Sequence, residues 1–221
     1  MSVDWATISS LATAGGTLVL AVATFASVRS ANRAARAAEE SLLDGLRPLL
    51  VNSRLQDPPE KISFSDRHWV HVPGGHGAVE ASDDAVYLAL ALRNVGRGMA
   101  VLQSWIVQPS LVWSPQQPDH RPLDEFRRLT RDLYIPAGDF GFWQGAIRDT
   151  GDPLFSPLHA ACMSDEGLTI EILYGDADGG QREISRFGMI PHKDPDSGER
   201  TWLAVTARHW SLDRQDPRDR P

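Results

Sequence analysis

The stretch WATISSLATAGGTLVLAVATFASV, residues 5–28, contains no charged side chain. As a helix rising about 1.5 Å per residue it would extend roughly 36 Å, more than the roughly 30 Å hydrocarbon core of a bilayer. This length predicts one N-terminal transmembrane helix over residues 5–28. A cleaved secretory signal and a buried helix of a soluble domain are the alternatives. A secretory signal normally carries positive charge before its apolar run, and here the only charged side chain before the run is Asp4.

The charges that flank this run predict its orientation. Arg29, Arg33 and Arg36 follow the run, and no lysine or arginine precedes it. Basic flanks stay on the cytoplasmic side of a membrane. We therefore expect a single-pass protein of the cell membrane, with the N-terminus outside and the C-terminal domain in the cytoplasm.

Small residues mark two surfaces on which this helix could pack. Ala12 and Gly16 are four residues apart and could form a close-approach face within the membrane. Helix-forming residues without proline continue over residues 29–44 and predict a helical stalk, which Gly45 and Pro48 would end. One side of this stalk would carry Ala31, Ala34, Ala35, Ala38 and Leu42. That side is either a solvated linker surface or a packing face for a second helix, from another copy or another protein.

The pattern changes at Pro48 to short apolar runs separated by glycine and proline turns. These runs predict strands over residues 49–55, 68–72, 85–94, 99–108, 130–135, 140–147, 168–175, 182–190 and 202–210. Glycines between residues 94 and 98 predict a hairpin of the third and fourth runs, and residues 176–181 predict a second hairpin. A short helix is expected from Asp152 to Met163.

Many short strands with few helices predict an all-β sandwich over residues 47–212. An immunoglobulin-like topology is the first choice and a jelly roll the second. Residues 213–221 form a polar tail, which we expect to be disordered. The chain organisation expected is therefore the helix and stalk over residues 1–46, the sandwich, and the tail.

Charge and cysteine content narrow the functional classes. The chain carries 22 basic and 29 acidic residues, a net charge of −7. Because phosphate backbones are bound by clustered lysine and arginine, this acidic chain is not expected to bind nucleic acid. Cys162 is the single cysteine and forms no internal disulfide, which suits a reducing compartment.

Several stretches are similar to those of a group of uncharacterised actinobacterial single-span membrane proteins. They are GTLVLAVATFASVRSANRAARAAE, GLRPLL, LALRNVGRGMAVL, RDLYIPAGDFGFWQG, ISRFGMI and RHWSLD. This resemblance covers the apolar helix and much of the remaining chain. It implies one membrane span carrying a cytosolic β-rich domain, and it implies no activity and no catalytic residue.

The common motifs for phosphate binding, zinc hydrolysis and serine nucleophiles do not occur in the sequence. His68, His71 and His76 lie close together in the chain, but residues three apart in a strand point to opposite faces. His71 and His76 are thus weak candidates for a metal site, and surface positions are the simpler interpretation. We predict no catalytic residue and no cofactor.

Two groups of aromatic and basic side chains are candidates for recognition. Arg131, Tyr134 and Trp143 surround one turn, and Arg208 and Trp210 lie near the C-terminus. Tryptophan, tyrosine and arginine are enriched at protein interfaces, although buried tryptophan is the common alternative. The sequence is most consistent with a membrane-anchored, non-enzymatic protein-interaction module that binds a partner or itself. A sensor of small molecules or lipids and a membrane-tethered enzyme of unrecognised type stay as alternatives.

Overall fold

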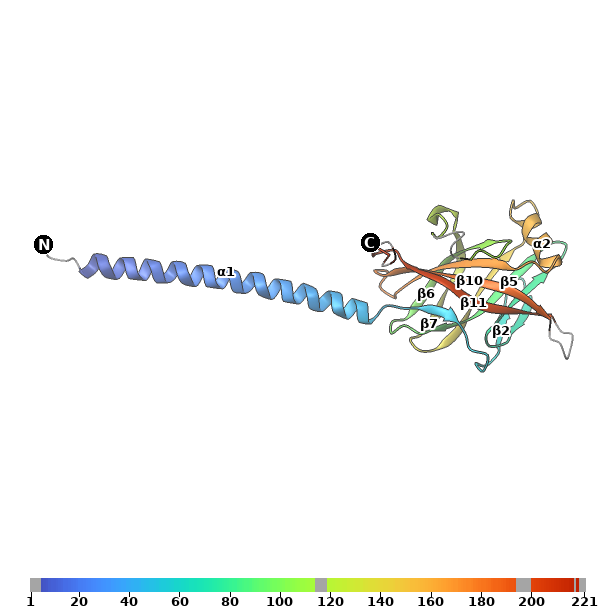
Figure 1. The fold of residues 1–221 in the computed structure, drawn as a ribbon, viewed down its shortest axis with the longest axis horizontal. Helices are drawn as coiled ribbons and strands as arrows, with labels where there is room; N and C mark the ends of the chain where they lie inside the picture. The colour runs from blue at the N-terminus through green and yellow to red at the C-terminus, as the bar shows by residue number, and fades with distance from the viewer. Residues whose placement is uncertain (1–4, 114–118, 194–199, 217, 219–221) are drawn as a thin grey trace. The chain divides into compact units, whose positions relative to one another are not determined.

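The computed structural model describes residues 5–113, 119–193, 200–216 and 218 (Figure 1). Within the first helix, the side chains at positions 5–8, 10–12, 40 and 44 lie outside this description. The chain divides into two compact units, Met1–Gly45 and Leu46–Pro221.

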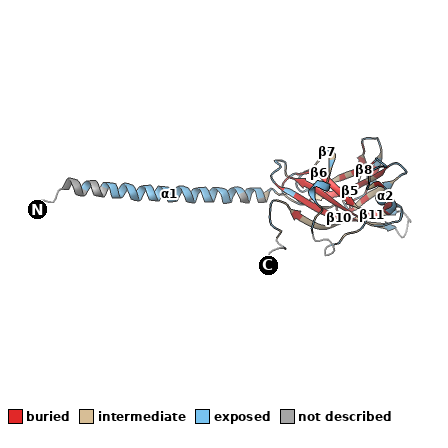
Figure 2. Ribbon diagram, turned by 90° about the horizontal axis from the view of Figure 1, so that it is seen from above, coloured by how far each residue is buried: buried red, intermediate tan, exposed pale blue. Residues whose placement is uncertain are grey.

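The first unit is one continuous helix, α1, which runs from Trp5 to Gly45 over 41 residues. It confirms that the apolar run and the stalk form a single element, and that the helix ends at Gly45. Its part Thr13–Leu43 is long enough to cross a membrane and contains a sufficiently apolar window, by length and composition. Every side chain described in α1 before Gly45 is exposed (Figure 2).

Three threonines of α1 satisfy their own hydroxyl groups. The hydroxyl groups of Thr13, Thr17 and Thr24 each donate to the backbone carbonyl four residues earlier, at 2.9, 2.8 and 2.8 Å. A polar group without a hydrogen-bond partner in hydrocarbon costs roughly several kcal/mol. Because these three hydroxyl groups are paired with the helix backbone, the helix is compatible with a lipid environment.

In its described residues, the second unit contains eleven strands, one short α-helix and one 3₁₀ turn. The strands are β1 Leu50–Asn52, β2 Glu60–Ser63, β3 Trp69–Val72, β4 His76–Ala81, β5 Val86–Asn94, β6 Ala100–Gln108, β7 Arg127–Ile135, β8 Phe140–Ile147, β9 Leu168–Gly175, β10 Arg182–Lys193 and β11 Arg200–Ser211. The turn is η1 Leu123–Glu125 and the helix is α2 Phe155–Met163. Strands β2 and β4 were not predicted, and β1 is shorter than the predicted run at residues 49–55.

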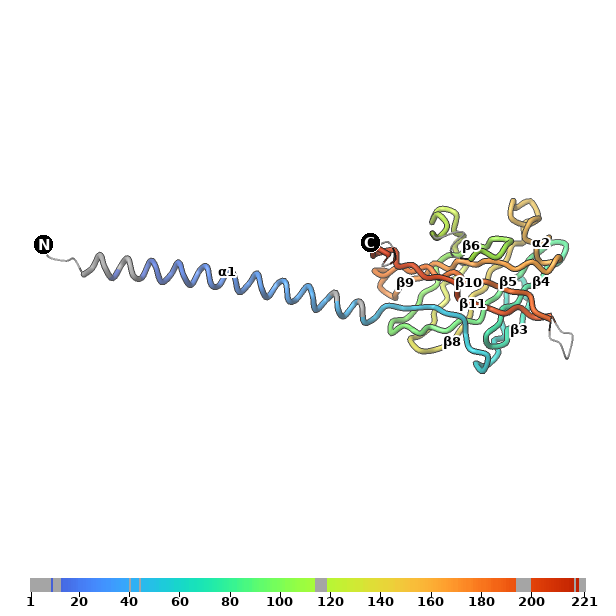
Figure 3. Tube along the Cα trace, in the orientation of Figure 1, coloured from blue at the N-terminus to red at the C-terminus, as the bar shows by residue number. Residues whose placement is uncertain are grey.

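Nine strands form one curled antiparallel sheet in the order β1-β5-β4-β11-β10-β9-β6-β7, with β8 paired to the other side of β5 (Figure 3). The remaining two strands, β2 and β3, pair only with each other. The β-rich fold with one N-terminal apolar helix is thus confirmed, whereas this topology confirms neither the immunoglobulin-like nor the jelly-roll arrangement.

The curled sheet encloses the main hydrophobic core. Its inner face carries large buried side chains from most strands, including Leu90, Trp105, Trp143, Ile170 and Phe187. Helix α2 adds Phe155, Leu158, Ala161 and Cys162 to the same cluster. Pro157 is the third residue of α2, in the first turn, where a missing N–H breaks no intrahelical bond. The β2–β3 hairpin packs Ile62, Phe64, Val70 and Val72 against a second cluster on the outer face of β5 and β8.

The predicted hairpin of β5 with β6 is wrong. Strand β5 pairs with β1, β4 and β8, whereas β6 pairs with β7 and β9. Gly96 and Gly98 do not have positive φ angles. They are needed for close approach instead, because a Cβ at Gly98 would lie 1.6 Å from the carbonyl oxygen of Leu46. The predicted hairpin of β9 with β10 is confirmed.

Candidate functional site

Strands β7 and β8 follow one another in the chain but diverge instead of pairing. Gly138, at a φ of +75°, forms the turn between them, and its backbone N–H donates to the carbonyl of Asn94 at 2.9 Å. From this turn β7 pairs with β6 and β8 pairs with β5. Among the described residues, no backbone hydrogen bond joins β7 to β8, so each strand keeps one open edge.

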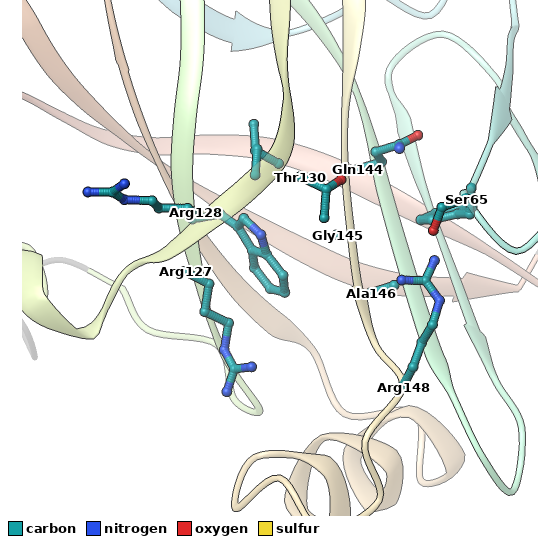
Figure 4. A pocket seen from close by; sticks show the side chains of 11 residues that line it. Ser65, Arg127, Arg128, Thr130, Gln144, Gly145, Ala146 and Arg148 are labelled. Atoms are coloured by element: carbon teal, nitrogen blue, oxygen red, sulfur yellow. The ribbon is translucent and has the colours of Figure 1, made fainter.

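The space between these two strands is a cavity of about 200 Å³, which we call the β7–β8 groove. It is lined by Phe64, Ser65, Trp105, residues 127–130, residues 144–146 and Arg148. Figure 4 shows Arg127, Arg128 and Thr130 on one side of the groove, and Gln144, Gly145, Ala146 and Arg148 on the other.

The floor of the groove is tightly packed. The ring of Trp105 meets that of Trp143 edge to face, with centroids 5.2 Å apart. A Cβ at Gly145 would lie 2.7 Å from the ring of Trp143 and 2.9 Å from that of Trp105. Position 145 therefore requires glycine, and the groove does not continue into the core.

Three arginines give the groove its charge. Arg127 forms two hydrogen bonds with the carboxylate of Asp152, at 2.6 and 2.8 Å. The Nε of Arg148 donates to Asp66 at 2.6 Å. Arg128 is exposed, and within the described part of the chain no carboxylate pairs with it. The groove thus holds two fixed guanidinium groups and one that is available to a ligand.

The two aspartates remain ionised because of these contacts. The hydrogen bonds from Arg127 hold the pKa of Asp152 below its ordinary value. Burial acts to raise the pKa of Asp66, but hydrogen bonds from Tyr87 and Arg148 outweigh it and lower this pKa well below the usual range. Both ion pairs therefore persist throughout the neutral range of pH.

Aromatic side chains support one wall of the groove. The hydroxyl of Tyr87 donates to Asp66 at 2.6 Å, and the guanidinium of Arg148 lies 5.4 Å from the centre of the Tyr87 ring. His68 stacks on Tyr87 at 4.0 Å and contacts Glu80 at 2.8 Å. These contacts fix the position of Arg148 relative to β8.

Gln144 adds a polar group that is not satisfied within the protein. Its side-chain oxygen Oε1 is buried and has no hydrogen-bond partner among the described residues. Such an atom costs free energy unless a partner is supplied.

A second polar cluster joins β10 and β11 and was missed by sequence reasoning. His209 lies 2.8 Å from Glu183 through Nε2 and 3.4 Å from the hydroxyl of Ser185 through Nδ1. Ser185 and His209 are cross-strand partners, which only the strand register could show.

The order serine, histidine, glutamate is that of a nucleophile relay, but the contacts of Ser185 are structural. Ser185 is fully buried, and its hydroxyl donates to the carbonyl of Leu50 at 3.0 Å. The Leu50 N–H donates to the hydroxyl of Tyr174 at 3.1 Å. Glu183 also pairs with Arg47 and accepts from Ser211. The cluster therefore attaches the segment around β1 to β10.

The described part of the predicted polar tail, residues 213–216 and 218, contacts this cluster. Residues 217 and 219–221 lie outside the described residues, so the expected disorder of the tail stays a prediction. Arg47 also donates to both carboxylate oxygens of Asp213, at 2.8 and 2.6 Å. Arg218 donates to the backbone carbonyl of His209 at 2.6 Å. The described part of residues 213–221 thus contacts the β-rich unit.

The recognition candidates separate into exposed and buried positions. Arg131 and Tyr134 are exposed on β7, and Tyr134 retains 59% of its accessible surface. Trp143 is fully buried in the core, so its interpretation as a surface recognition residue is wrong. Trp210 is also buried, between the guanidinium groups of Arg186 and Arg208 at 4.8 and 5.3 Å from its ring centre. It is therefore not an exposed contact either.

The two metal candidates, His71 and His76, do not form a site. His71 is exposed on β3, and the Nδ1 of His76 contacts the carbonyl of Gly74 at 2.6 Å. Throughout the described residues, no group of three or more histidine, cysteine or acidic side chains is arranged to hold a metal ion. The structure does not test the proposed packing faces of α1. The stalk positions Ala31, Ala34, Ala35, Ala38 and Leu42 are exposed, Gly16 has open space around it, and the side chain of Ala12 lies outside the described residues.

Comparisons of the chain with models of protein families, with curated protein sequences and with solved structures find no match.

Proposed function

We propose that this chain is a membrane-anchored, non-enzymatic protein-interaction module. In this proposal α1 crosses the cell membrane with the N-terminus outside. The β-rich unit lies in the cytoplasm and contacts a partner protein through the β7–β8 groove. The resemblance to single-span actinobacterial membrane proteins implies the single span and the cytosolic β-rich domain, and nothing about the groove.

The observation that carries the membrane anchor is the exposed apolar surface of α1. Its large side chains Leu18, Val19, Leu20, Val22, Phe25 and Val28 each expose 53–70% of their surface. Burying one such side chain is worth about 1.5–3 kcal/mol. Since the helices of soluble cores are mostly buried, lipid is the environment that best suits this surface.

The size of the β7–β8 groove favours a protein partner over a small molecule. Small-molecule pockets typically enclose roughly 300–1,000 Å³, whereas the groove measures about 200 Å³. A space of this size suits one or two side chains of a longer segment, and the arginines beside it are typical of protein interfaces.

Fractionation and capture test the two parts of this proposal. The full-length protein should stay in the membrane pellet after alkaline carbonate extraction, and a form that lacks residues 1–45 should not sediment with membranes. Affinity purification of the tagged full-length protein from native membranes should recover a second protein in stoichiometric amount. Release by carbonate would refute the anchor. Repeated recovery of the protein alone in mild detergent would refute the interaction module.

A further inference from the structure

We propose that the β7–β8 groove binds an extended, acidic segment of a partner protein. The backbone of this segment pairs with an open strand edge, and its carboxylates contact the groove arginines. This inference rests on the proposed function and specifies the chemistry of the partner.

Strands β7 and β8 each present an open backbone edge to the groove. Within the described parts of the chain, strand β7 pairs only with β6, and β8 pairs only with β5. No other backbone hydrogen bond occupies their facing edges among the described residues. An unpaired edge is a template for another strand, and many peptide-binding domains use it to bind extended segments.

The charge of the groove differs from that of the surrounding chain. Residues 47–221 contain 19 basic and 25 acidic side chains, so this part of the chain is acidic on average. The groove reverses this balance, because three arginines line it and only two aspartates pair with them. Arg128 carries the unpaired charge. Of the donors of Arg148, only Nε bonds to Asp66, which leaves other guanidinium donors for a second carboxylate.

The shape and polar lining of the groove suit an extended backbone. The rings of Trp105 and Trp143 close the floor, and Gly145 lets the backbone of β8 approach them. Ser65 and Thr130 also line the groove at exposed positions, and their hydroxyl groups can accept a hydrogen bond from a backbone N–H. An extended chain offers such an N–H beside each carboxylate side chain.

The test uses the full-length protein in a non-ionic detergent and a fluorescein-labelled octapeptide of alternating valine and glutamate. Fluorescence anisotropy should show saturable binding that weakens as salt rises, because exposed charges are screened. The same peptide with lysine in place of glutamate should bind at least about tenfold more weakly. N-methylation of alternate peptide nitrogens should also weaken binding about tenfold, since it removes the donors of one strand edge.

Two variants of β7 provide the matched comparison. Arg128→Glu and Arg131→Glu make the same change of charge at exposed positions of the same strand, and only Arg128 lines the groove. Arg128→Glu should weaken the acidic peptide about tenfold or more, and Arg131→Glu should change its affinity by less than about threefold. Unchanged thermal melting of both variants would show that the fold is intact.

Several results would overturn the inference. The first is an equal loss of peptide affinity in Arg128→Glu and Arg131→Glu. The second is that the lysine peptide binds as tightly as the glutamate peptide, or that N-methylation leaves binding unchanged. The third is full competition by inorganic phosphate at the concentration of the peptide. The proposed function is tested separately by partner capture. Capture that Arg128→Glu leaves intact would refute the groove and retain the interaction module, whereas capture by neither protein would refute the interaction module itself.

Discussion

Trp143 lies in the core, although its neighbours in the sequence suggested an exposed recognition residue. It is fully buried, and its indole N–H has no partner among the described residues. Trp143→Ala should lower the free energy of unfolding by about 3–5 kcal/mol, because it leaves a cavity beside Trp105. Trp143→Phe should cost less, since it also removes an unsatisfied donor. Urea denaturation measures both, and an alanine variant as stable as the parent would place Trp143 outside the core.

Cys162 makes a prediction about reactivity at the same scale. Burial raises the pKa of its thiol to about 11. Because the thiolate is the reactive form, iodoacetamide should not modify the folded protein at pH 8. Intact mass analysis should show one added carbamidomethyl group only after denaturation. Rapid modification of the folded protein would contradict the burial of this thiol.

At the scale of elements, a buried ion pair on β9 and β10 holds the backbone of Asp119 and Arg121, just before η1. Arg186 contacts one carboxylate oxygen of Glu171 at 2.8 and 2.6 Å, and it donates to the backbone carbonyl of Asp119 at 2.6 Å. The backbone N–H of Arg121 donates to the other carboxylate oxygen at 2.9 Å. Both charged side chains are fully buried.

Replacing one member of this ion pair should destabilise the protein more than replacing both members. Glu171→Leu removes the carboxylate that balances the buried Arg186 charge and should lower the free energy of unfolding by about 3–5 kcal/mol. The double variant Glu171→Leu/Arg186→Met removes both charges and should recover most of this loss. Chemical denaturation of the three proteins measures the difference. A double variant less stable than the single one would show that the hydrogen bonds to the loop dominate.

The ion pair of Asp57 with Arg93 predicts a dependence of stability on pH. Arg93 joins β5 to the loop before β2, with an Nη2 to Oδ1 distance of 2.5 Å. Hydrogen bonds from Arg93 lower the pKa of Asp57 from 3.8 in the folded protein. A lowered folded pKa gives stability above the unfolded pKa that is lost as pH falls through the folded value. Asp57→Asn should therefore be less stable than the parent at pH 7, and this difference should shrink below pH 4, roughly. A difference independent of pH would exclude the ion pair as its source.

Local sequence patterns predicted the helices and strands better than they predicted which strands pair. The uncharged run before Arg29 predicts α1, and the alternation around Ile170 and Ile184 predicts the β9–β10 hairpin, because both signals are local. The pairing of β5 with β8 depends on contacts about fifty residues apart, as between Leu90 and Trp143. The groove combines segments around residues 64, 105, 128 and 145. No spacing in the sequence brings these segments together, so the site required the topology.

At the scale of the whole molecule, the prediction is the orientation of α1 in the membrane. Arg29, Arg33 and Arg36 follow the apolar run, and no basic residue precedes it. With Cys162→Ser as background, a Ser2→Cys protein should react with a membrane-impermeant maleimide in intact cells, because the proposed topology places its N-terminus outside.

The charges themselves can be tested by moving them across the span. Replacement of Arg29, Arg33 and Arg36 by glutamine, with Val3→Lys and Asp4→Lys on the other side, should invert the helix, because basic flanks are retained in the cytoplasm. The inverted protein should lose maleimide labelling until the cells are permeabilised. Labelling that is unchanged would mean that the folded β-rich unit, rather than the arginines, fixes the orientation. Labelling of neither protein in intact cells would contradict the proposed topology.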